Sequence, residues 1–271
     1  MIESAGPVIL FGGGRMGSAL LRGWIEAGVP AGHITVIEPK PGPDLVTSST
    51  AAGFVLNGRL RSRPRQSIVL AVKPQKSSEL TADIQSIAAD DTLVISIMAG
   101  KTISDLRRLC PGIRAVVRAM PNLPAAVGRG MTVACADPNC TEEHLQAARQ
   151  LLGSTGRLEW LNDEALIDAA TGVSGSGPAY LFYIADCLAR AGVAAGLPGD
   201  VAERLARATV SGAGELLHAS SKSAAELRND VTSPAGTTEA GLKVLMKDDL
   251  LQAMLTGTVE AAMRRARELA G

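Results

Sequence analysis

A glycine-rich turn near the start of the chain constrains its fold more than any other feature. The turn consists of six residues, Gly12, Gly13, Gly14, Arg15, Met16 and Gly17. They fit the pattern G-x-G-x-x-G, directly after an apolar run (residues 7–11) and before a helical stretch. In that context the first glycine permits a tight turn, the second lets the backbone approach a pyrophosphate, and the third lets helix and strand pack closely. The pattern predicts a dinucleotide at the amino end of the helix, where free N–H groups point at the pyrophosphate.

The first 160 residues alternate between short apolar runs and helical stretches. We expect strands at residues 7–11, 34–37, 67–72, 92–97, 114–118, 131–136 and 157–160. We expect helices at residues 16–27, 74–89, 103–109 and 142–152. Strand, helix and strand at this spacing predict right-handed βαβ units and a parallel sheet. The sequence therefore predicts an α/β domain over residues 1–160.

After residue 160 the β-branched runs stop and helical stretches follow one another. We expect helices at residues 165–171, 178–195, 200–218, 224–228, 238–246 and 250–269. Many of them are rich in alanine and have few polar positions, so more than one of their faces should be covered. The sequence predicts an all-α domain over residues 161–271 that self-associates.

Charge and apolar patterning exclude several classes of partner. The chain has 27 Lys and Arg residues against 27 Asp and Glu residues, which gives no general attraction to nucleic acid or to an anionic membrane surface. The most apolar stretch, residues 179–197, contains Asp186 and Arg190, so we expect no membrane span. Residues 1–4 include an acid and no basic residue, so we expect no export signal.

The cysteines form no pattern that binds a metal. The chain has four of them, Cys110, Cys135, Cys140 and Cys187. They form neither a CxxC pair nor a cluster with histidine. We expect scattered reduced thiols in a cytoplasmic protein without a metal site.

The expected coenzyme is NADP(H), NAD(H) or both. Glu38 ends the second strand about 20 residues after the last glycine of the turn, where an acid binds the ribose of a dinucleotide. An acid there hydrogen-bonds a free 2′-hydroxyl and repels a 2′-phosphate. Basic residues nearby could instead hold that phosphate: Lys40, Arg59, Arg61, Arg63 and Arg65. The sequence leaves the choice open.

Six segments carry a resemblance to a known family. They are residues 11–17, 71–74, 96–100, 118–125, 172–180 and 230–238. In order and spacing they resemble the pyrroline-5-carboxylate reductases. The resemblance implies an N-terminal Rossmann domain, a helical domain that interleaves two subunits, and assembly as a dimer or as a decamer built from dimers. The implied reaction is the reduction of L-1-pyrroline-5-carboxylate to L-proline by NAD(P)H, the last step of proline biosynthesis.

The resemblance places the substrate at residues 233–238. Backbone N–H groups of that loop would hold the substrate carboxylate, and the Thr238 hydroxyl, the expected catalytic group, would lie beside the ring nitrogen. The other implied substrate contacts are Ser233, Gly236, Thr237, Asn122 and Glu164. From the residues alone, the loop is also consistent with an ordinary helix cap at Thr237 or Thr238. Glu164 could equally cap a helix.

The resemblance also assigns coenzyme contacts to the ends of two later strands. They are Ala71, Val72, Lys73 and Pro74 after one strand, and Ala99 and Gly100 after the next. Ligands of doubly wound sheets bind at such carboxyl ends. Lys73 as a catalytic acid is the less favoured alternative. Asp230 departs from the family pattern, in which relatives often have Asn.

The residues argue against three competing functions. The β-hydroxyacid dehydrogenases need Lys and Asn at the positions of Leu181 and Ala185, so that class is rejected. No register of residues 172–177 gives the G-x-S-x-G of a serine hydrolase. A non-catalytic NAD-binding sensor would keep the glycine turn but would have no reason to carry the loop at residues 233–238.

Overall fold

The computed structural model describes residues 6–270, which contain one eight-stranded sheet. The strands are β1 (Val8–Phe11), β2 (Ile34–Ile37), β3 (Val55–Leu56), β4 (Ser67–Leu70), β5 (Leu93–Ser96), β6 (Ala115–Met120), β7 (Gly130–Ala136) and β8 (Gly156–Trp160). Their order is β3-β2-β1-β4-β5-β6-β7-β8. The residues form two compact units, one comprising the chain up to Gly175 together with the chain from Ala262 onward, the other Ser176–Ala261. The segment 1–4, considered above as an export signal, lies outside the described residues.

The prediction of a wholly parallel sheet is wrong at one pairing. All pairings within the run β3-β2-β1-β4-β5-β6 are parallel, but β7 runs antiparallel to β6, with Arg118 opposite Cys135. Strand β8 is in turn parallel to β7. The β6–β7 connection holds only a short 3₁₀ turn, η3 (Leu123–Val127), whereas parallel strands need a crossover of a dozen or more residues, usually a helix.

The described residues of the first unit up to Gly175 form six α-helices. They are α1 (Arg15–Glu26), α2 (Pro43–Ala52), α3 (Thr81–Ile87), α4 (Ile103–Leu109), α5 (Glu142–Gly153) and α6 (Leu166–Ala170). The single helix expected at residues 74–89 is divided into a 3₁₀ segment, η2 (Pro74–Leu80), and α3. Helix α6 continues into a π-helical turn, η4 (Thr171–Gly175). One further 3₁₀ turn, η1 (Ala31–His33), precedes β2.

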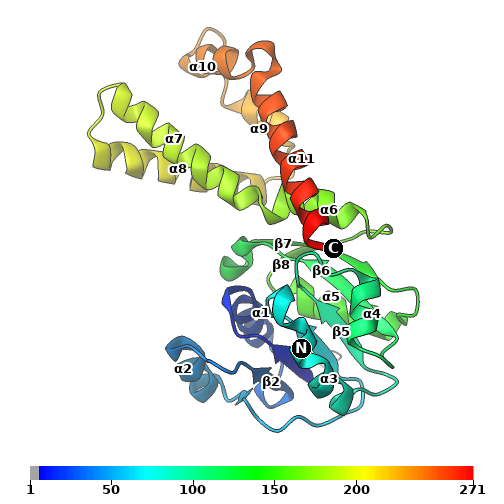
Figure 1. Ribbon diagram of the computed structural model, residues 1–271. Coiled ribbons are helices and arrows are strands. Elements are labelled where there is room, and N and C mark those ends of the chain that lie inside the picture. The colour runs from blue at the N-terminus through cyan, green and yellow to red at the C-terminus, as the bar shows by residue number, and fades with distance from the viewer. Residues whose placement is uncertain (1–5, 271) are drawn as a thin grey trace. The chain divides into compact units, whose positions relative to one another are not determined.

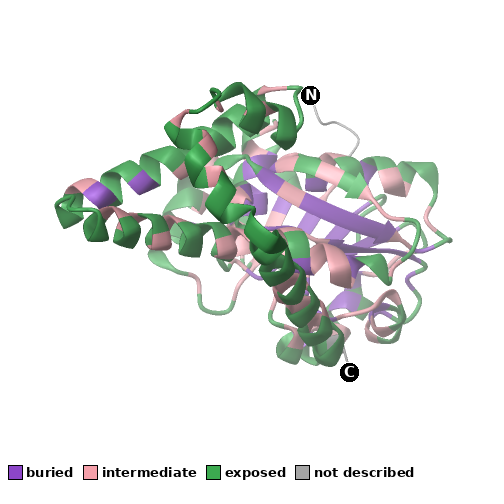
Figure 2. Cartoon of the chain, turned by 90° about the horizontal axis from the view of Figure 1, so that it is seen from above, coloured by how far each residue is buried: buried purple, intermediate pink, exposed green. Residues whose placement is uncertain are grey.

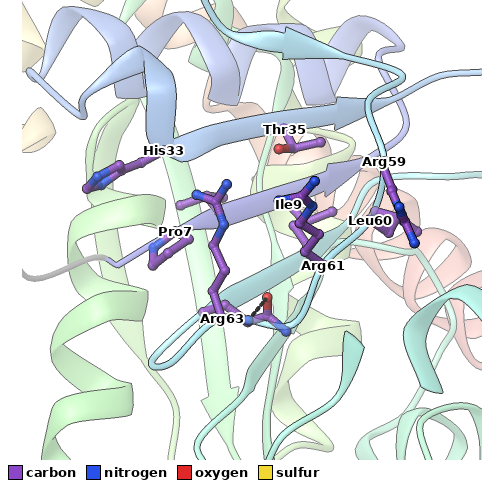
Figure 3. A pocket seen from close by; sticks show the side chains of 10 residues that line it. Pro7, Ile9, His33, Thr35, Arg59, Leu60, Arg61 and Arg63 are labelled. Atoms are coloured by element: carbon purple, nitrogen blue, oxygen red, sulfur yellow. Dashed lines mark hydrogen bonds between the residues drawn. The ribbon is translucent and has the colours of Figure 1, made fainter. Parts of the chain in front are cut away.

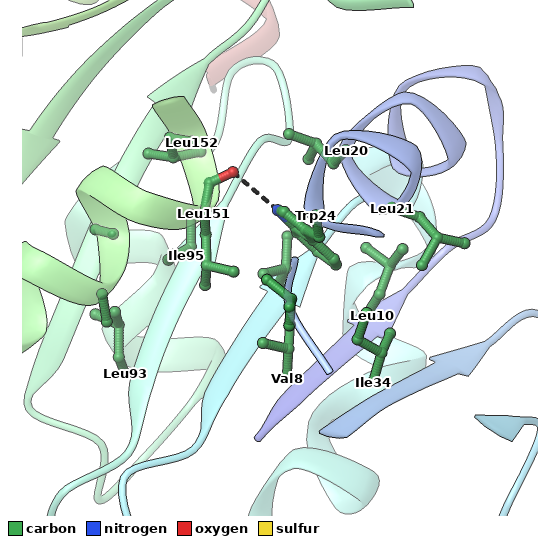
Figure 4. Packing of buried hydrophobic residues seen from close by; sticks show 14 of the residues in the cluster. Val8, Leu10, Leu20, Leu21, Trp24, Ile34, Leu93, Ile95, Leu151 and Leu152 are labelled. Carbon is green, nitrogen blue, oxygen red and sulfur yellow. Dashed lines mark hydrogen bonds between the residues drawn. The ribbon is translucent and has the colours of Figure 1, made fainter. Parts of the chain in front are cut away.

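Two apolar layers cover the sheet. Strands β1, β4 and β5 are buried along their whole length, because helices pack on both faces. One layer joins α1 and α5, where the Trp24 indole donates to the Leu151 carbonyl at 2.8 Å (Figure 4). The other contains Ile84 and Ile87 of α3 and Leu106 of α4. These layers fix the carboxyl ends of the strands, where the glycine turn lies.

The second unit is helical, as expected. It contains α7 (Gly177–Ala194), α8 (Gly199–Ala219), α9 (Ala224–Asp230), α10 (Thr237–Leu245), a 3₁₀ turn η5 (Lys247–Asp249) and the first part of α11 (Leu250–Ala270). Helices α7 and α8 pack against each other, and the loop between them turns at Gly196, whose φ is 101°. Figure 1 shows these helices and the sheet, and Figure 2 shows buried residues gathered in the strands while α7 and α8 stay largely exposed. Within the described residues, no helix has the length and apolar character needed to cross a membrane.

Candidate functional site

The glycine turn follows β1 directly, and its glycines serve different purposes. Gly12 has a φ of 102°, and a Cβ atom there would lie 2.6 Å from the Ala71 carbonyl oxygen. A Cβ atom on Gly17 would lie 2.1 Å from the Gly12 carbonyl oxygen. Around Gly14, by contrast, no atom lies within 4 Å of the position a Cβ would take. The fold itself requires Gly12 and Gly17, whereas the space at Gly14 is free for a ligand.

The amino end of α1 is electrostatically suited to an anion. Gly14 is its N-cap, no side chain caps the helix, and its first turn contains no acidic residue. The first N–H groups of a helix have no intrahelical partner and carry a partial positive charge. Arg15 is exposed and Met16 half-buried beside them. A pyrophosphate lying over Gly14 fits this end, as the sequence predicts.

Glu38 lies beside the glycine turn, where the sequence places the ribose-binding acid. Its carboxylate accepts hydrogen bonds from the Gly13 N–H (2.9 Å) and the Lys40 N–H (3.1 Å). A Cβ atom on Gly13 would lie 2.4 Å from the Leu45 side chain, so this glycine is needed for packing against α2. The hydrogen bond from Gly13 holds the Glu38 carboxylate beside the glycine turn, and the bond from Lys40 fixes its other oxygen.

Asn57, which no sequence pattern singled out, holds the backbone of Glu38. The Asn57 side chain accepts from the Glu38 N–H (2.8 Å) and donates to the Glu38 carbonyl (2.9 Å). Its φ of 51° lies in the left-handed region, which Asn tolerates better than most residues. An Asn-Gly pair after a short apolar run was the available signal, but it points only to a turn.

The ends of β4 and β5 lie at the same edge of the sheet as the glycine turn. The Ala71 N–H donates to the Phe11 carbonyl at 2.8 Å, which places Ala71 next to Gly12. Val72, Lys73 and Pro74 follow, with Lys73 exposed at the start of η2. Ala99 and Gly100 follow β5, and Gly100 has a φ of 74°. Parallel pairing of β1, β4 and β5 thus brings these predicted coenzyme contacts to one edge.

Asn122 and Glu164 are both engaged with other parts of the first unit. The Asn122 amide donates to the Ser174 carbonyl (3.0 Å) and accepts from the Met131 N–H (2.8 Å). One Glu164 oxygen accepts from the Ile103 N–H (2.8 Å) and from Arg118 (3.0 Å). Glu164 therefore lies at the amino end of α4 and is paired with a buried guanidinium.

Arg118 is the centre of a buried charge cluster that was not predicted from the sequence. Its side chain is only 6% exposed and contacts Glu164 at 3.0 Å and Asp168 at 3.1 Å. Arg267 lies 3.8 Å from the second Asp168 oxygen. Because Arg118 offsets its charge, Glu164 is less suited to balancing the charge of an iminium than a free carboxylate would be. An arginine within an apolar strand was the signal for this cluster.

The loop at residues 233–238 belongs to the second unit. The Gly236 N–H donates to the Ser233 carbonyl at 3.0 Å, and a Cβ atom on Gly236 would lie 2.5 Å from the Ser233 hydroxyl oxygen. Gly236 is the N-cap of α10, and no side chain caps that helix. The alternative of a cap at Thr237 or Thr238 is therefore wrong. Both threonines are exposed in the first turn of α10.

Glu239 completes this loop. Its carboxylate accepts from the Ala235 N–H (2.6 Å) and pairs with Lys243 (2.7 Å). The hydrogen bond from Lys243, followed by that from the Ala235 backbone, holds the pKa of Glu239 below its usual range. Ala235 has a φ of 58°, a left-handed conformation that non-glycine residues rarely adopt. The bond to Glu239 supports this bend at the start of α10.

The fold and the glycine turn together place the chain in the class of nicotinamide-dinucleotide oxidoreductases that have a helical second domain. Residues 7–100 match the family model described as NADP oxidoreductase coenzyme F420-dependent, and residues 164–269 match that for pyrroline-5-carboxylate reductase dimerisation. Pyrroline-5-carboxylate reductase of Pisum sativum is 37% identical over 95% of this chain and 94% of that protein. The Haemophilus influenzae pyrroline-5-carboxylate reductase is 32% identical over 97% of both chains. The chain belongs to the pyrroline-5-carboxylate reductase family.

Solved structures agree with this assignment. The structure of a pyrroline-5-carboxylate reductase from Coxiella burnetii has a TM-score of 0.88 and 31% identity, over 98% of this chain and 99% of that one. Plasmodium falciparum pyrroline carboxylate reductase with NADP bound has a TM-score of 0.78 and 27% identity, over 97% and 98% of the two chains. The expected Rossmann fold, followed by a helical domain, is thereby confirmed.

Proposed function

We propose that this protein reduces L-1-pyrroline-5-carboxylate to L-proline with NADPH or NADH. The observation that carries the proposal is the full-length similarity to pyrroline-5-carboxylate reductases, which spans both the glycine turn and the loop at residues 233–238. The open space at Gly14 supports the coenzyme part of it, because only a missing side chain lets a pyrophosphate approach there.

The chemistry needs little acid–base machinery. The carbon of a C=N bond becomes strongly electrophilic once the nitrogen is protonated, and a ring iminium can take that proton from solvent. A bound nicotinamide supplies the hydride. The protein has to hold the coenzyme at the carboxyl ends of β1, β4 and β5 and present one face of the substrate ring. No side chain at that edge then has to act as an acid, which disfavours Lys73 in this role.

The loop at residues 233–238 is proposed as the substrate clamp. Its N–H groups precede and begin α10, where a small carboxylate is favoured. The Thr238 hydroxyl is exposed and is not needed as a helix cap, so it is available to the ring nitrogen. Ser233, Gly236 and Thr237 would complete the clamp. Contacts from Asn122 and Glu164 are proposed only as supports, since both are engaged elsewhere.

The helical unit is proposed to form a dimer, or a decamer assembled from dimers. None of the α7 residues is buried in the single chain, and large apolar side chains of the unit are exposed. They include Leu181, Phe182, Tyr183, Leu188, Leu251 and Met254. An apolar surface of this extent on a helical unit marks a protein–protein interface. The mass of the particle in solution, by light scattering, distinguishes the two assemblies, and a stable active monomer contradicts both.

An assay of coenzyme oxidation tests the function. Purified protein should oxidise NADPH or NADH only when L-1-pyrroline-5-carboxylate is present. Run with both coenzymes, the same assay gives their relative kcat/KM. A sensor without catalytic activity would bind the coenzyme but leave it reduced.

A further inference from the structure

Asn57 extends the pairing of β2 with β3 by one residue. The backbone pairs of the two strands end at Val36 and Leu56. Asn57 donates its N–H to the Val36 carbonyl at 2.8 Å and then leaves the extended conformation, with a φ of 51°. Its side-chain amide takes the place of a peptide group, accepting from the Glu38 N–H at 2.8 Å and donating to the Glu38 carbonyl at 2.9 Å. One side chain therefore holds both polar groups of the Glu38 backbone.

The Glu38 carboxylate, held in this way, lies at the glycine turn. One of its oxygens accepts from the Gly13 N–H at 2.9 Å, and the other accepts from the Lys40 N–H at 3.1 Å. Each carboxylate oxygen can accept a second hydrogen bond. A ribose with a free 2′-hydroxyl can donate that second bond, whereas a 2′-phosphate would meet a negative charge that is fixed in position.

Three arginines that follow Asn57 in the chain lie along the opposite halves of the strands. They border a hollow of about 20 Å³, room for no more than a water molecule, together with residues from the first halves of β1 and β2: Arg59, Arg61, Arg63, Val8, Ile9 and Thr35. Figure 3 shows the side chains of Arg61 and Arg63 extending across β1, with Arg59 farther along the segment. Glu38 instead follows the last residue of β2. Because backbone N–H groups rather than a guanidinium hold its carboxylate, Glu38 keeps its negative charge beside the glycine turn.

We propose that Asn57 is a positioning residue for the choice of coenzyme: by fixing Glu38 beside the glycine turn, it favours NADH over NADPH. This inference rests on the proposed function, which uses either coenzyme, and adds the residue that biases the choice between them. Without the Asn57 side chain, the Glu38 backbone loses two hydrogen bonds, and the carboxylate can move away from an approaching 2′-phosphate. The repulsion then falls, and the discrimination against NADPH falls with it.

Fluorescence titration of the full chain with NADH and with NADPH tests the proposal, and neither titration requires turnover of a substrate. Asn57→Gly is the informative variant, because glycine readily adopts a φ of 51° and keeps the N–H that is bonded to Val36. We expect the Kd for NADPH divided by the Kd for NADH to fall about three- to tenfold, the scale of the net contribution of a hydrogen bond. A purely structural role for Asn57 would weaken both coenzymes equally and leave this ratio unchanged.

A double-mutant cycle tests whether Asn57 acts through Glu38. In a Glu38→Ser background, Asn57→Gly should change the ratio of the two Kd values by less than about twofold, because no carboxylate remains to be positioned. Asn139→Gly is the matched control: the Asn139 amide likewise holds a neighbouring acid, donating to Asp137 at 2.8 Å. That substitution should leave the ratio unchanged. Thermal melting of each variant verifies that the fold is retained.

Two results overturn the proposal. One is an unchanged ratio of the Kd values in Asn57→Gly. The other is a shift of the same size with and without Glu38, which would mean that Asn57 acts on the coenzyme by another route. Failure of the proposed function has a different signature, because both coenzymes would still bind with the expected ratio while L-1-pyrroline-5-carboxylate is not reduced.

Discussion

The contrast between Gly14 and Gly17 yields a sharp prediction about the coenzyme site. Gly14 has φ −68° and ψ −173°, an ordinary extended conformation, and free space surrounds the position of its missing Cβ. Gly14→Val should therefore leave the fold intact. A loss of about 0.5–1 kcal/mol at the helix N-cap is offset by a similar gain from a less flexible unfolded chain. For a chain of this size the melting temperature should stay within about 4 °C of wild type.

The same substitution should strongly weaken coenzyme binding. The valine side chain fills the space through which the pyrophosphate approaches the amino end of α1. Losing one charge-assisted backbone contact costs about 1.5–3 kcal/mol. That corresponds to a Kd for NADH or NADPH raised about 10- to 150-fold. Fluorescence titration with each coenzyme measures this change.

Gly17→Val is the comparison variant. Its Cβ would lie 2.1 Å from the Gly12 carbonyl oxygen, so α1 has to shift against β1. We expect a marked fall in melting temperature from that substitution, in contrast to Gly14→Val. The reasoning is refuted if Gly14→Val binds both coenzymes with unchanged Kd, or if it melts as early as Gly17→Val.

Substitutions at three further residues probe the remaining groups. Glu38→Ser should raise the kcat/KM ratio of NADPH over NADH by about 1–3 kcal/mol, because it removes a charge that repels a 2′-phosphate; an unchanged ratio would show that Glu38 does not face the ribose. Thr238→Ala should lower kcat/KM by about 1–3 kcal/mol while Thr238→Ser retains most activity, with both melting temperatures unchanged. A loss confined to melting temperature would contradict the proposed contact with the substrate. Burial raises the pKa of Asp137, but hydrogen bonds from Arg107 and Asn139 outweigh it and hold the pKa below its usual range. Arg107 also forms an ion pair with Asp137. Asp137→Asn should therefore reduce the free energy of unfolding by about 1–3 kcal/mol at pH 7, and the difference should shrink as the pH falls below about 4; a constant difference across that range contradicts a contribution from this ion pair.

Periodicity and glycine placement were sufficient to predict most of the first unit. The fully buried strands read as continuous apolar runs, and G-x-G-x-x-G has a fixed structural context, so β1, β4, β5 and α1 were found within a few residues. The helices after residue 160 were equally clear, because helical spacing persists there without β-branched runs.

The features that were not predicted from the sequence have physical explanations. Strand β3 has two residues and α2 begins at Pro43 within a stretch of weak amphipathicity, so neither gives a periodic signal. The direction of β7 depends on the length of its connection to β6, which apolar patterns do not encode. Asn57 and Arg118 act through partners 19 and 46 residues away, and spacing along the chain does not predict such contacts.

The most direct test of the proposed function follows the hydride from the coenzyme to the product. NADPH or NADH carrying deuterium at the transferable position is incubated with the purified protein and L-1-pyrroline-5-carboxylate, and the product is analysed by mass spectrometry and NMR. We expect L-proline carrying one deuterium at the ring carbon that was double-bonded to nitrogen, in equal amount to the coenzyme oxidised. Unlabelled proline, or coenzyme that stays reduced while substrate is present, would contradict it.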